Sequence, residues 1–229
     1  MRRIIPIVSV LCVALSSWTA VAGAATKSAA QILELSVANM KVEGSFHYAS
    51  TSSIGGKVAL TLAADSALTY GTQTENLGGG IETTRLIGTK LFIFADATAY
   101  DEDFDLPKSK LANRWVEVPA SNKNYGSIAD AILVKSVMQQ LLAIGKVKYG
   151  GTVTINGQAA YALERDAGTS GSEVIYVSEA APHLPIALTI HASSGGRKIV
   201  NKLVFSKWGE KFRVPTPPSF VVATQKTLP

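Results

Sequence analysis

Apolar residues recur at two different spacings along the chain, and the change of spacing predicts a helix followed by strands. Between Thr26 and Met40 the apolar side chains lie three or four residues apart, on one side of an amphipathic helix that ends before Gly44. After Gly44, apolar and polar positions alternate, which is typical of strands with one buried face. The alternating positions include Val58, Leu60, Leu62, Leu68, Tyr70 and Thr72. Turn-like residues separate these strands and predict consecutive antiparallel hairpins, with turns at Gly55-Gly56, Ala64-Asp65-Ser66, Gly78-Gly79-Gly80 and Gly88-Thr89.

A second helix is predicted from Ser127 to Ile144. Ser127 suits its N-cap and Gly145 suits its end. Its apolar side chains fill an arc of roughly 180°, wider than the ~100° stripe of a surface helix, so we expect it to be deeply buried. Before it lie a polar, acidic segment from Asp96 to Lys110 and an extended stretch from Arg114 to Val118.

Further strands follow the second helix, and Asn156-Gly157 between two of them is the strongest hairpin signal in the chain. These strands are expected at 146–155, 158–164, 173–178, 184–191 and 199–206. With about ten strands, few helices and no β-α-β alternation, the pattern predicts an α+β fold, a single curved antiparallel sheet with helices against one face. The domain spans residues 25–214, and the Pro-rich tail from Pro215 to Pro229 is expected not to continue the sheet.

The N-terminus has the features of a secretory signal peptide, residues 1–24. Two arginines precede an apolar run from Ile4 to Leu15, and small residues allow cleavage near Ala22 or Ala24. The run is too short to span a bilayer. The single cysteine, Cys12, lies inside it, so neither a lipid anchor nor a disulfide is expected. The mature protein is therefore expected to be secreted or held in the cell envelope.

Composition and charge narrow the classes of partner. With 47% hydrophobic and 17% charged residues, the chain suits a folded domain. The net charge is only +5, and the densest basic stretch, Arg197 to Lys211, interleaves cations with apolar residues, so nucleic acid is not an expected partner.

Residues that carry chemistry are sparse and form no local motif. The three histidines, His47, His183 and His191, have no partners at metal-ligand spacing. The acidic cluster from Asp101 to Asp105 lacks the glycine and the terminal acid of a calcium loop, so we interpret it as a solvated loop. We expect no metal, no cofactor and no catalytic activity.

The C-terminal residues resemble a known family. The segment from Leu203 to Glu210, followed by Val214-Pro215 and Pro217-Pro218, resembles the end of the mycobacterial LppX/LprAFG lipoproteins. The hairpin from Gly151 to Gly157 and the later Leu184-Pro185 are similar in order and spacing. The likeness covers most of residues 26–222.

This resemblance implies a half-barrel like those of the LolA and LolB lipoprotein carriers, with helices across the concave side and an apolar cavity between them. It also implies a non-catalytic carrier of acylated lipids or glycolipids, compatible with a partner transporter, with transient membrane contact and with a monomer. Family members carry a lipobox cysteine that this chain lacks, which favours a freely diffusing carrier. By strand parity and helix face, the candidate lipid-binding residues are Leu60, Leu62, Leu68, Tyr70, Ile132, Leu133, Val137, Leu141, Tyr161, Leu163, Leu188 and Ile190.

Three alternatives stay open at this point. Each candidate lipid-binding residue could instead pack an ordinary core, because periodicity does not separate a filled core from a lined cavity. The protein could be a secreted interaction or chaperone-like module without lipid cargo. A hydrolase would require serine, histidine and an acid to meet only in three dimensions.

Overall fold

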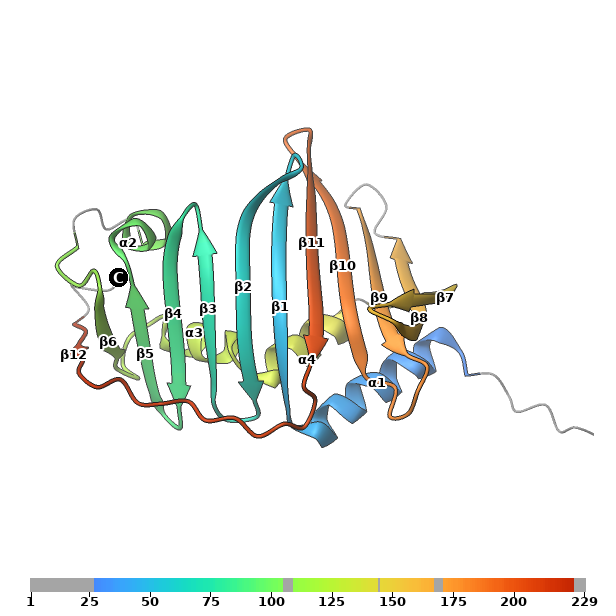
Figure 1. Ribbon diagram of the computed structural model, residues 1–229, viewed down its shortest axis with the longest axis horizontal. Helices are drawn as coiled ribbons and strands as arrows, with labels where there is room; N and C mark the ends of the chain where they lie inside the picture. The colour runs from blue at the N-terminus through green and yellow to red at the C-terminus, as the bar shows by residue number, and fades with distance from the viewer. Residues whose placement is uncertain (1–26, 105–108, 144, 167–170, 225–229) are drawn as a thin grey trace, which may run out of the picture.

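A computed structural model describes residues 27–104, 109–143, 145–166 and 171–224. The predicted signal peptide and Cys12 lie outside these residues. Within them, the chain forms one twelve-stranded sheet in the order β12-β6-β5-β4-β3-β2-β1-β11-β10-β9-β8-β7 (Figure 1). No described helix is long and apolar enough to cross a membrane.

The first half of the chain contributes α1 (Ala29–Glu43), β1 (Ser45–Ile54), β2 (Lys57–Ala67), β3 (Gly71–Leu77), β4 (Gly80–Ile87), β5 (Lys90–Ala95), α2 (Ala97–Phe104) and β6 (Arg114–Val118). The second half contributes α3 (Tyr125–Ala131), α4 (Val134–Ala143), β7 (Lys148–Ile155), β8 (Gln158–Asp166), β9 (Ser172–Ser178), β10 (Pro185–Ser194), β11 (Arg197–Ser206) and β12 (Val221–Val222). All neighbouring strands pair antiparallel except β12, which pairs parallel with β6. The predicted α+β class, with one curved antiparallel sheet and helices across its concave face, is confirmed.

Local sequence signals fix both ends of α1. The Ser28 hydroxyl accepts from the Gln31 amide at 3.2 Å, and the Gln31 side chain accepts from the Ser28 amide at 2.8 Å, which forms a capping box. Gly44 closes the helix in the left-handed conformation, with φ 71°. The helix predicted before Gly44 is therefore present, shifted by three residues toward the C-terminus.

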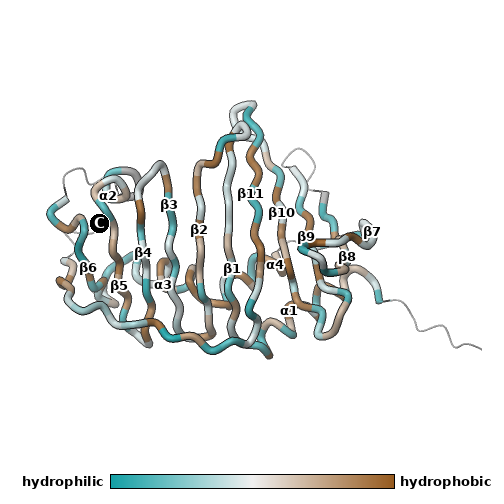
Figure 2. Tube along the Cα trace, viewed as in Figure 1, coloured by the Kyte–Doolittle hydropathy of each residue, from teal (hydrophilic) through white to brown (hydrophobic). Residues whose placement is uncertain are grey.

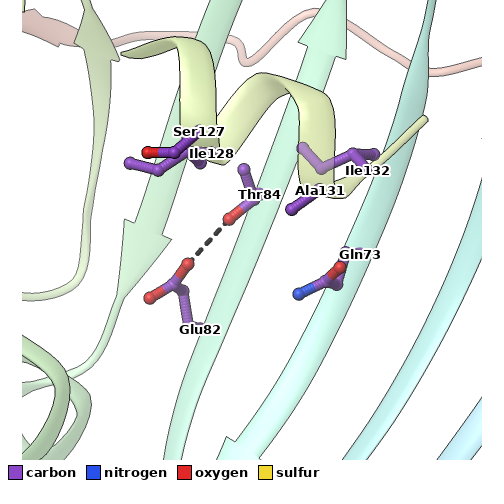
Figure 3. A pocket seen from close by; sticks show the side chains of 7 residues that line it. All are labelled: Gln73, Glu82, Thr84, Ser127, Ile128, Ala131 and Ile132. Atoms are coloured by element: carbon purple, nitrogen blue, oxygen red, sulfur yellow. Dashed lines mark hydrogen bonds between the residues drawn. The ribbon is translucent and has the colours of Figure 1, made fainter. Parts of the chain in front are cut away.

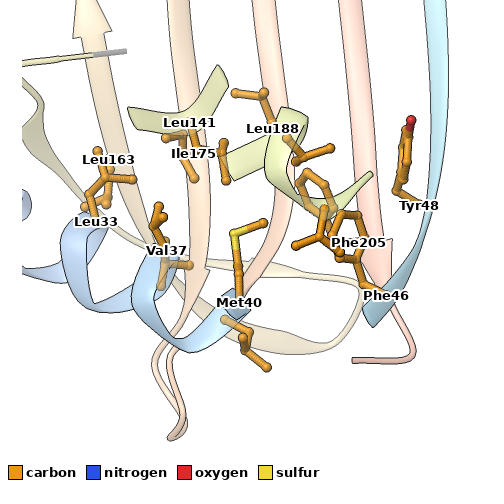
Figure 4. Close-up of a cluster of buried hydrophobic side chains, with 14 of the residues drawn as sticks. Leu33, Val37, Met40, Phe46, Tyr48, Leu141, Leu163, Ile175, Leu188 and Phe205 are labelled. Carbon is orange, nitrogen blue, oxygen red and sulfur yellow. The ribbon is translucent and has the colours of Figure 1, made fainter. Parts of the chain in front are cut away.

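Two groups of buried apolar side chains join the helices to the concave face. In the larger group, Leu33, Val37 and Met40 of α1 point toward the sheet residues Leu163 and Phe205 (Figure 4). The same group includes Val134, Val137 and Leu141 of α4. The smaller group packs Ala129 and Ile132 against Leu91 and Ile93 of β5. Figure 2 shows apolar and polar positions alternating along the central strands, as expected for a sheet covered on one face.

The second predicted helix is broken into α3 and α4 around Ile132, which corrects the single helix expected from Ser127 to Ile144. The Ser66 hydroxyl on β2 donates to the Ile132 carbonyl at 2.7 Å, and Gly71 leaves room for the Ile132 side chain. The N-cap is Asn124 rather than Ser127, whose hydroxyl lies inside α3 and donates to the Asn124 carbonyl at 2.9 Å. A tertiary contact therefore overrides the helical periodicity.

Two further segments differ from the expectation. The turn predicted at Ala64-Asp65-Ser66 is strand, because β2 pairs with β1 as far as Ala67. Residues 68–70 form the turn instead, so Leu68 and Tyr70 lie between β2 and β3. The acidic segment contains helix α2 instead of being a loop throughout, because the Asp96 carboxylate accepts from the Ala99 amide at 2.8 Å, which satisfies an amide at the start of the helix.

The C-terminal tail returns to the sheet. After β11 the chain runs along the lower ends of the strands to the far edge (Figure 1), where Val221 and Val222 pair with β6. Tyr70 packs on Phe212, and Phe92 packs on Phe220, with ring centres 5.0 Å and 5.1 Å apart. We call residues 212–222 the C-terminal strap. The prolines do not pair, as expected, but the two valines do.

Candidate functional site

One row of side chains on the concave face extends beyond the helices. In Figure 1 the helices α3 and α4 cross the lower part of the sheet, and the upper ends of β1, β2, β10 and β11 continue past them. The strand registers place five residues directly opposite one another across β3, β2, β1, β11 and β10. We call this row the concave strip: Leu77, Leu60, Ser52, Asn201 and Ile190.

All five residues of the concave strip are half-buried. Strands lie about 4.8 Å apart, so the row spans about 19 Å, comparable to an extended long acyl chain. Below it, Leu62 and Leu203 pack against the larger buried group, as does Ile190 of the strip itself. The concave strip therefore lies at the edge of the buried core, between fully packed side chains and solvent-exposed surface.

A hollow lies at the β2–β3 end of the concave strip. It has a volume of about 380 Å³, and Leu60 and Leu77 line it together with Val58 and the Gly78-Gly79 turn. Val58 is 63% exposed. The apolar end of the strip thus opens into a space within the usual size range of small-molecule sites, about 300 to 1,000 Å³.

The middle of the concave strip is polar. Ser52 and Asn201 lie opposite each other, between Leu60 on one side and Ile190 on the other. The side-chain oxygen Oδ1 of Asn201 is buried and accepts no hydrogen bond from the described residues. Buried polar atoms without partners are rare, so this oxygen calls for a physical explanation.

Charged and packed groups bound the strip at both ends. On β9 and β8, Glu173 and Arg165 continue the row beyond Ile190, and the Arg165 guanidinium donates to both Glu173 oxygens at 3.0 Å and 2.8 Å. These hydrogen bonds raise the pKa of Arg165. At the opposite end, Gly80 follows Leu77 in register and lies against Ala99 of α2.

A second, smaller pocket lies between α3 and the sheet (Figure 3). Its volume is about 270 Å³, and its sheet side is polar, formed by Gln73, Glu82 and Thr84. Ile128 and Ile132 lie on the helix side. The Thr84 hydroxyl donates to the Glu82 carboxylate at 2.7 Å. This pocket suits small polar groups better than acyl chains.

Tyr48 lies on the concave face below the strip, and its environment holds its hydroxyl neutral. Burial, and to a lesser extent the negative charge of Glu75, raise the pKa of Tyr48 to about 12. Tyr100 belongs to α2 and is fully buried, and it shows the same behaviour: burial, and then the charge of Glu82, raise its pKa to about 12.

Ten of the twelve predicted lipid-binding residues divide into three sets in the structure. Leu60, Leu62 and Ile190 lie in or beside the concave strip. Leu133 and Tyr161 are half-buried at the margins of the two apolar groups. The fully packed set is Ile132, Val137, Leu141, Leu163 and Leu188.

Leu68 and Tyr70 do not join the others. Leu68 is 51% exposed in the turn after β2, and the Tyr70 hydroxyl lies 3.5 Å from the Phe212 carbonyl on the strap. Sequence reasoning missed Leu77, Ser52 and Asn201. Parity along β11 marks Asn201, because it lies two and four residues before the half-buried Leu203 and the buried Phe205 and so points to the same face.

One histidine has an acidic partner that the sequence did not reveal. His47 Nδ1 lies 2.9 Å from the Asp65 carboxylate across β1 and β2, and Ser206 on β11 lies opposite His47 in register. The order Asp65, His47, Ser206 matches the chemical order of a serine hydrolase triad. The row lies on the face away from the helices, however, and Ser206 makes no hydrogen bond to His47.

No cluster of three or more metal-ligating side chains occurs in the part of the chain that the structure describes. Within the concave strip the polar groups are one hydroxyl and one amide, those of Ser52 and Asn201, between apolar residues. This arrangement can hold an apolar molecule and hydrogen-bond one polar group on it.

The whole architecture has counterparts among solved structures, although no protein-family model matches the chain and no curated protein matches it by sequence. The lipoprotein LppX of Mycobacterium tuberculosis is 16% identical with a TM-score of 0.51, and the match covers 80% of this chain and 96% of LppX. LprF of Mycobacterium bovis is 14% identical with a TM-score of 0.50, and the match covers 82% of this chain and 96% of LprF. The chain therefore has the fold of the mycobacterial lipoproteins LppX and LprF, as the sequence resemblance predicted.

Proposed function

We propose that this protein is a non-catalytic lipid-binding protein that carries acylated lipids or glycolipids through the cell envelope after export. The observation that carries the proposal is the concave strip, a row of half-buried side chains at the edge of the packed helices. The predicted signal peptide supports the location. The shared fold with two lipoproteins is compatible with the proposal.

The chemistry of the concave strip favours an alkyl chain. Leu60, Leu77 and the exposed Val58 offer apolar surface next to a hollow of about 380 Å³. Each methylene removed from water contributes about 0.8 kcal/mol, so a long chain binds without many polar contacts. This explains how binding can proceed without a recognisable sequence motif.

The packing below the strip limits where a chain can lie. Val137 and Leu141 of α4 are 4% and 0% exposed, so their side chains already fill the space between α4 and the sheet. Side chains at this density leave few voids. The alkyl chain is therefore expected to lie along the concave strip and in the hollow, beside the packed helices rather than beneath them.

The first test is native mass spectrometry of the mature protein purified from a mycobacterial host, followed by organic extraction of the bound material. A stoichiometric acylated species supports the proposal and names the cargo. A clean apo mass, together with no binding of added fatty acid, favours an interaction or chaperone-like module instead.

A direct binding test uses cis-parinaric acid, a fluorescent fatty acid, with the purified protein. The double variant Leu60→Gln/Ile190→Gln is expected to weaken binding about ten-fold or more, because apolar contacts with the chain are lost. Val204→Gln is the matched control, because Val204 is 40% exposed on the opposite face of the same sheet. Equal weakening by both variants would contradict binding at the strip.

A further inference from the structure

We infer that the lipid held by this protein carries a hydroxyl group that binds at Asn201, in the middle of the concave strip. This inference rests on the proposed function, because it specifies which polar group accompanies the alkyl chain. It follows from the unpartnered amide oxygen of Asn201 and from the residues on either side of it.

The row has a polar centre between apolar ends. Ser52 faces Asn201 across β1 and β11, Leu60 follows Ser52, and Ile190 follows Asn201. An alkyl chain that lies along the row places its carbons on Leu60 and Ile190, and the part of the ligand between these contacts lies over the Asn201 amide. A purely apolar ligand would leave the amide without a partner, which is costly.

The amide chemistry selects a hydroxyl over an ether or ester oxygen. Asn201 offers one carbonyl acceptor and one NH₂ donor on the same side chain. A hydroxyl can donate to the first and accept from the second, whereas an ether or ester oxygen only accepts. Because Oδ1 is the atom without a partner, the ligand must supply a donor.

A charged head group is less suited to this position. The nearest ionic groups in the row, Arg165 and Glu173, already bind each other with two hydrogen bonds. Neither an ammonium nor a phosphate would find an opposite charge free in that pair. The row therefore recognises an uncharged hydroxyl, either at the end of a chain or along it.

The test compares two pairs of probes that differ only in the hydroxyl. Hexadecan-1-ol and 1-methoxyhexadecane differ in a terminal donor, and methyl 12-hydroxyoctadecanoate and methyl octadecanoate differ in a donor along the chain. Each is measured by displacement of cis-parinaric acid. We expect at least one hydroxyl-bearing probe to bind about five-fold more tightly than its partner, the effect of one hydrogen bond.

Asn201→Leu is expected to remove this preference while it keeps binding of the probes without a hydroxyl. Asn201→Ala serves if leucine disturbs the fold, and His191→Leu on the opposite face is the control, because it adds the same side chain away from the row. Circular dichroism verifies folding of each variant.

The outcomes separate the two proposals. If wild type binds all four probes but without preference, or if Asn201→Leu keeps the preference, the hydroxyl inference is wrong and the lipid-binding proposal stands. If wild type binds none of the probes and carries no lipid from its host, both proposals are wrong. The more effective probe pair tells whether the hydroxyl is terminal or within the chain.

Discussion

The guanidinium of Arg85 lies 4.3 Å from the centre of the Trp115 ring and donates to the Pro215 carbonyl at 3.0 Å. Arg85 on β4 thus ties the C-terminal strap to the face of the sheet away from the helices. Burial lowers the pKa of Arg85 from its usual value, but at neutral pH the side chain stays charged. The cation–π contact and the hydrogen bond both depend on that charge.

Arg85→Met is expected to loosen the strap without unfolding the sheet. Exposed cation–π contacts contribute about 0.5 to 1 kcal/mol and a hydrogen bond to a charged group about 1.5 to 3 kcal/mol. Hydrogen–deuterium exchange of residues 212–222 should therefore rise, with exchange in β1 and β11 unchanged. Arg213→Met, at an exposed arginine of the strap itself, is the control. Protection equal to wild type in Arg85→Met would show that the aromatic contacts of Phe212 and Phe220 and the pairing of β12 with β6 hold the strap without Arg85.

A second prediction concerns the break between α3 and α4. The buried Ser66 hydroxyl is the partner of the Ile132 carbonyl at 2.7 Å, so Ser66→Ala leaves that carbonyl without it. We expect a loss of about 1 to 3 kcal/mol in the free energy of unfolding, measured by urea denaturation. Ser206→Ala, at an exposed serine on β11, should change it by less than about 0.5 kcal/mol. Equal stability of the two variants would mean that another donor reaches Ile132.

A third prediction follows from the tyrosines. The pKa of Tyr48 is raised from 10.0 to about 12 by burial and by Glu75, and that of Tyr100 is raised likewise. Below about pH 10 both states keep the protons, and between about pH 10 and 12 only the unfolded state loses them. The free energy of unfolding should therefore fall in this window as pH rises, by about 1.4 kcal/mol per pH unit for each tyrosine.

Tyr48→Phe is expected to remove about half of the fall that these two tyrosines cause, and Glu75→Gln a smaller part, because it removes only the charge. Urea denaturation at about pH 9 and about pH 11 measures the difference. An alkaline slope in Tyr48→Phe equal to that of wild type would contradict the assignment to Tyr48.

The hydrolase alternative now has a specific test. Asp65, His47 and Ser206 share one row, but the row is open to solvent and Ser206 is not bonded to His47. We expect a fluorophosphonate probe to label wild type no more than Ser206→Ala. Stoichiometric labelling of wild type that is lost in both Ser206→Ala and His47→Ala would show an active nucleophile and contradict the non-catalytic proposal.

Local signals predicted the elements whose ends are set by neighbouring residues. Asn156 and Gly157 have positive φ values, 51° and 80°, as their hairpin turn requires, and Gly44 ends α1 as expected. The family likeness supplied the placement of helices on the concave face, which strand periodicity alone does not encode. Parity also assigned Leu60 and Ile190 to the face on which they lie.

Features created by distant contacts could not be predicted in this way. The helix break at Ile132 depends on Ser66 and Gly71, which precede it by more than sixty residues. The pair His47 and Asp65 depends on the register of β1 against β2. For the site, periodicity predicted on which face of the sheet each residue lies. It did not predict how much of that face α4 covers, and this coverage separates the packed Leu188 from the half-buried Ile190.

The last prediction compares a residue of the packed core, Val137, with a residue of the concave strip, Leu60. If the second predicted helix lined an open cavity, as the family resemblance implies, Leu133→Trp or Val137→Trp would reduce lipid loading without unfolding the protein. Val137 is 4% exposed and packs within the larger buried group, so a tryptophan there overfills a packed core. We expect Val137→Trp to lower the free energy of unfolding by about 1 to 3 kcal/mol.

At the concave strip we expect the reverse, a loss of lipid binding without a loss of stability. Leu60→Gln should leave the free energy of unfolding within about 1 kcal/mol of wild type, because Leu60 is half-buried, while it weakens binding of cis-parinaric acid. Urea denaturation and fluorescence titration of both variants test the pair. If Val137→Trp stays fully stable and loses binding, whereas Leu60→Gln binds normally, the alkyl chain lies between α4 and the sheet rather than along the concave strip.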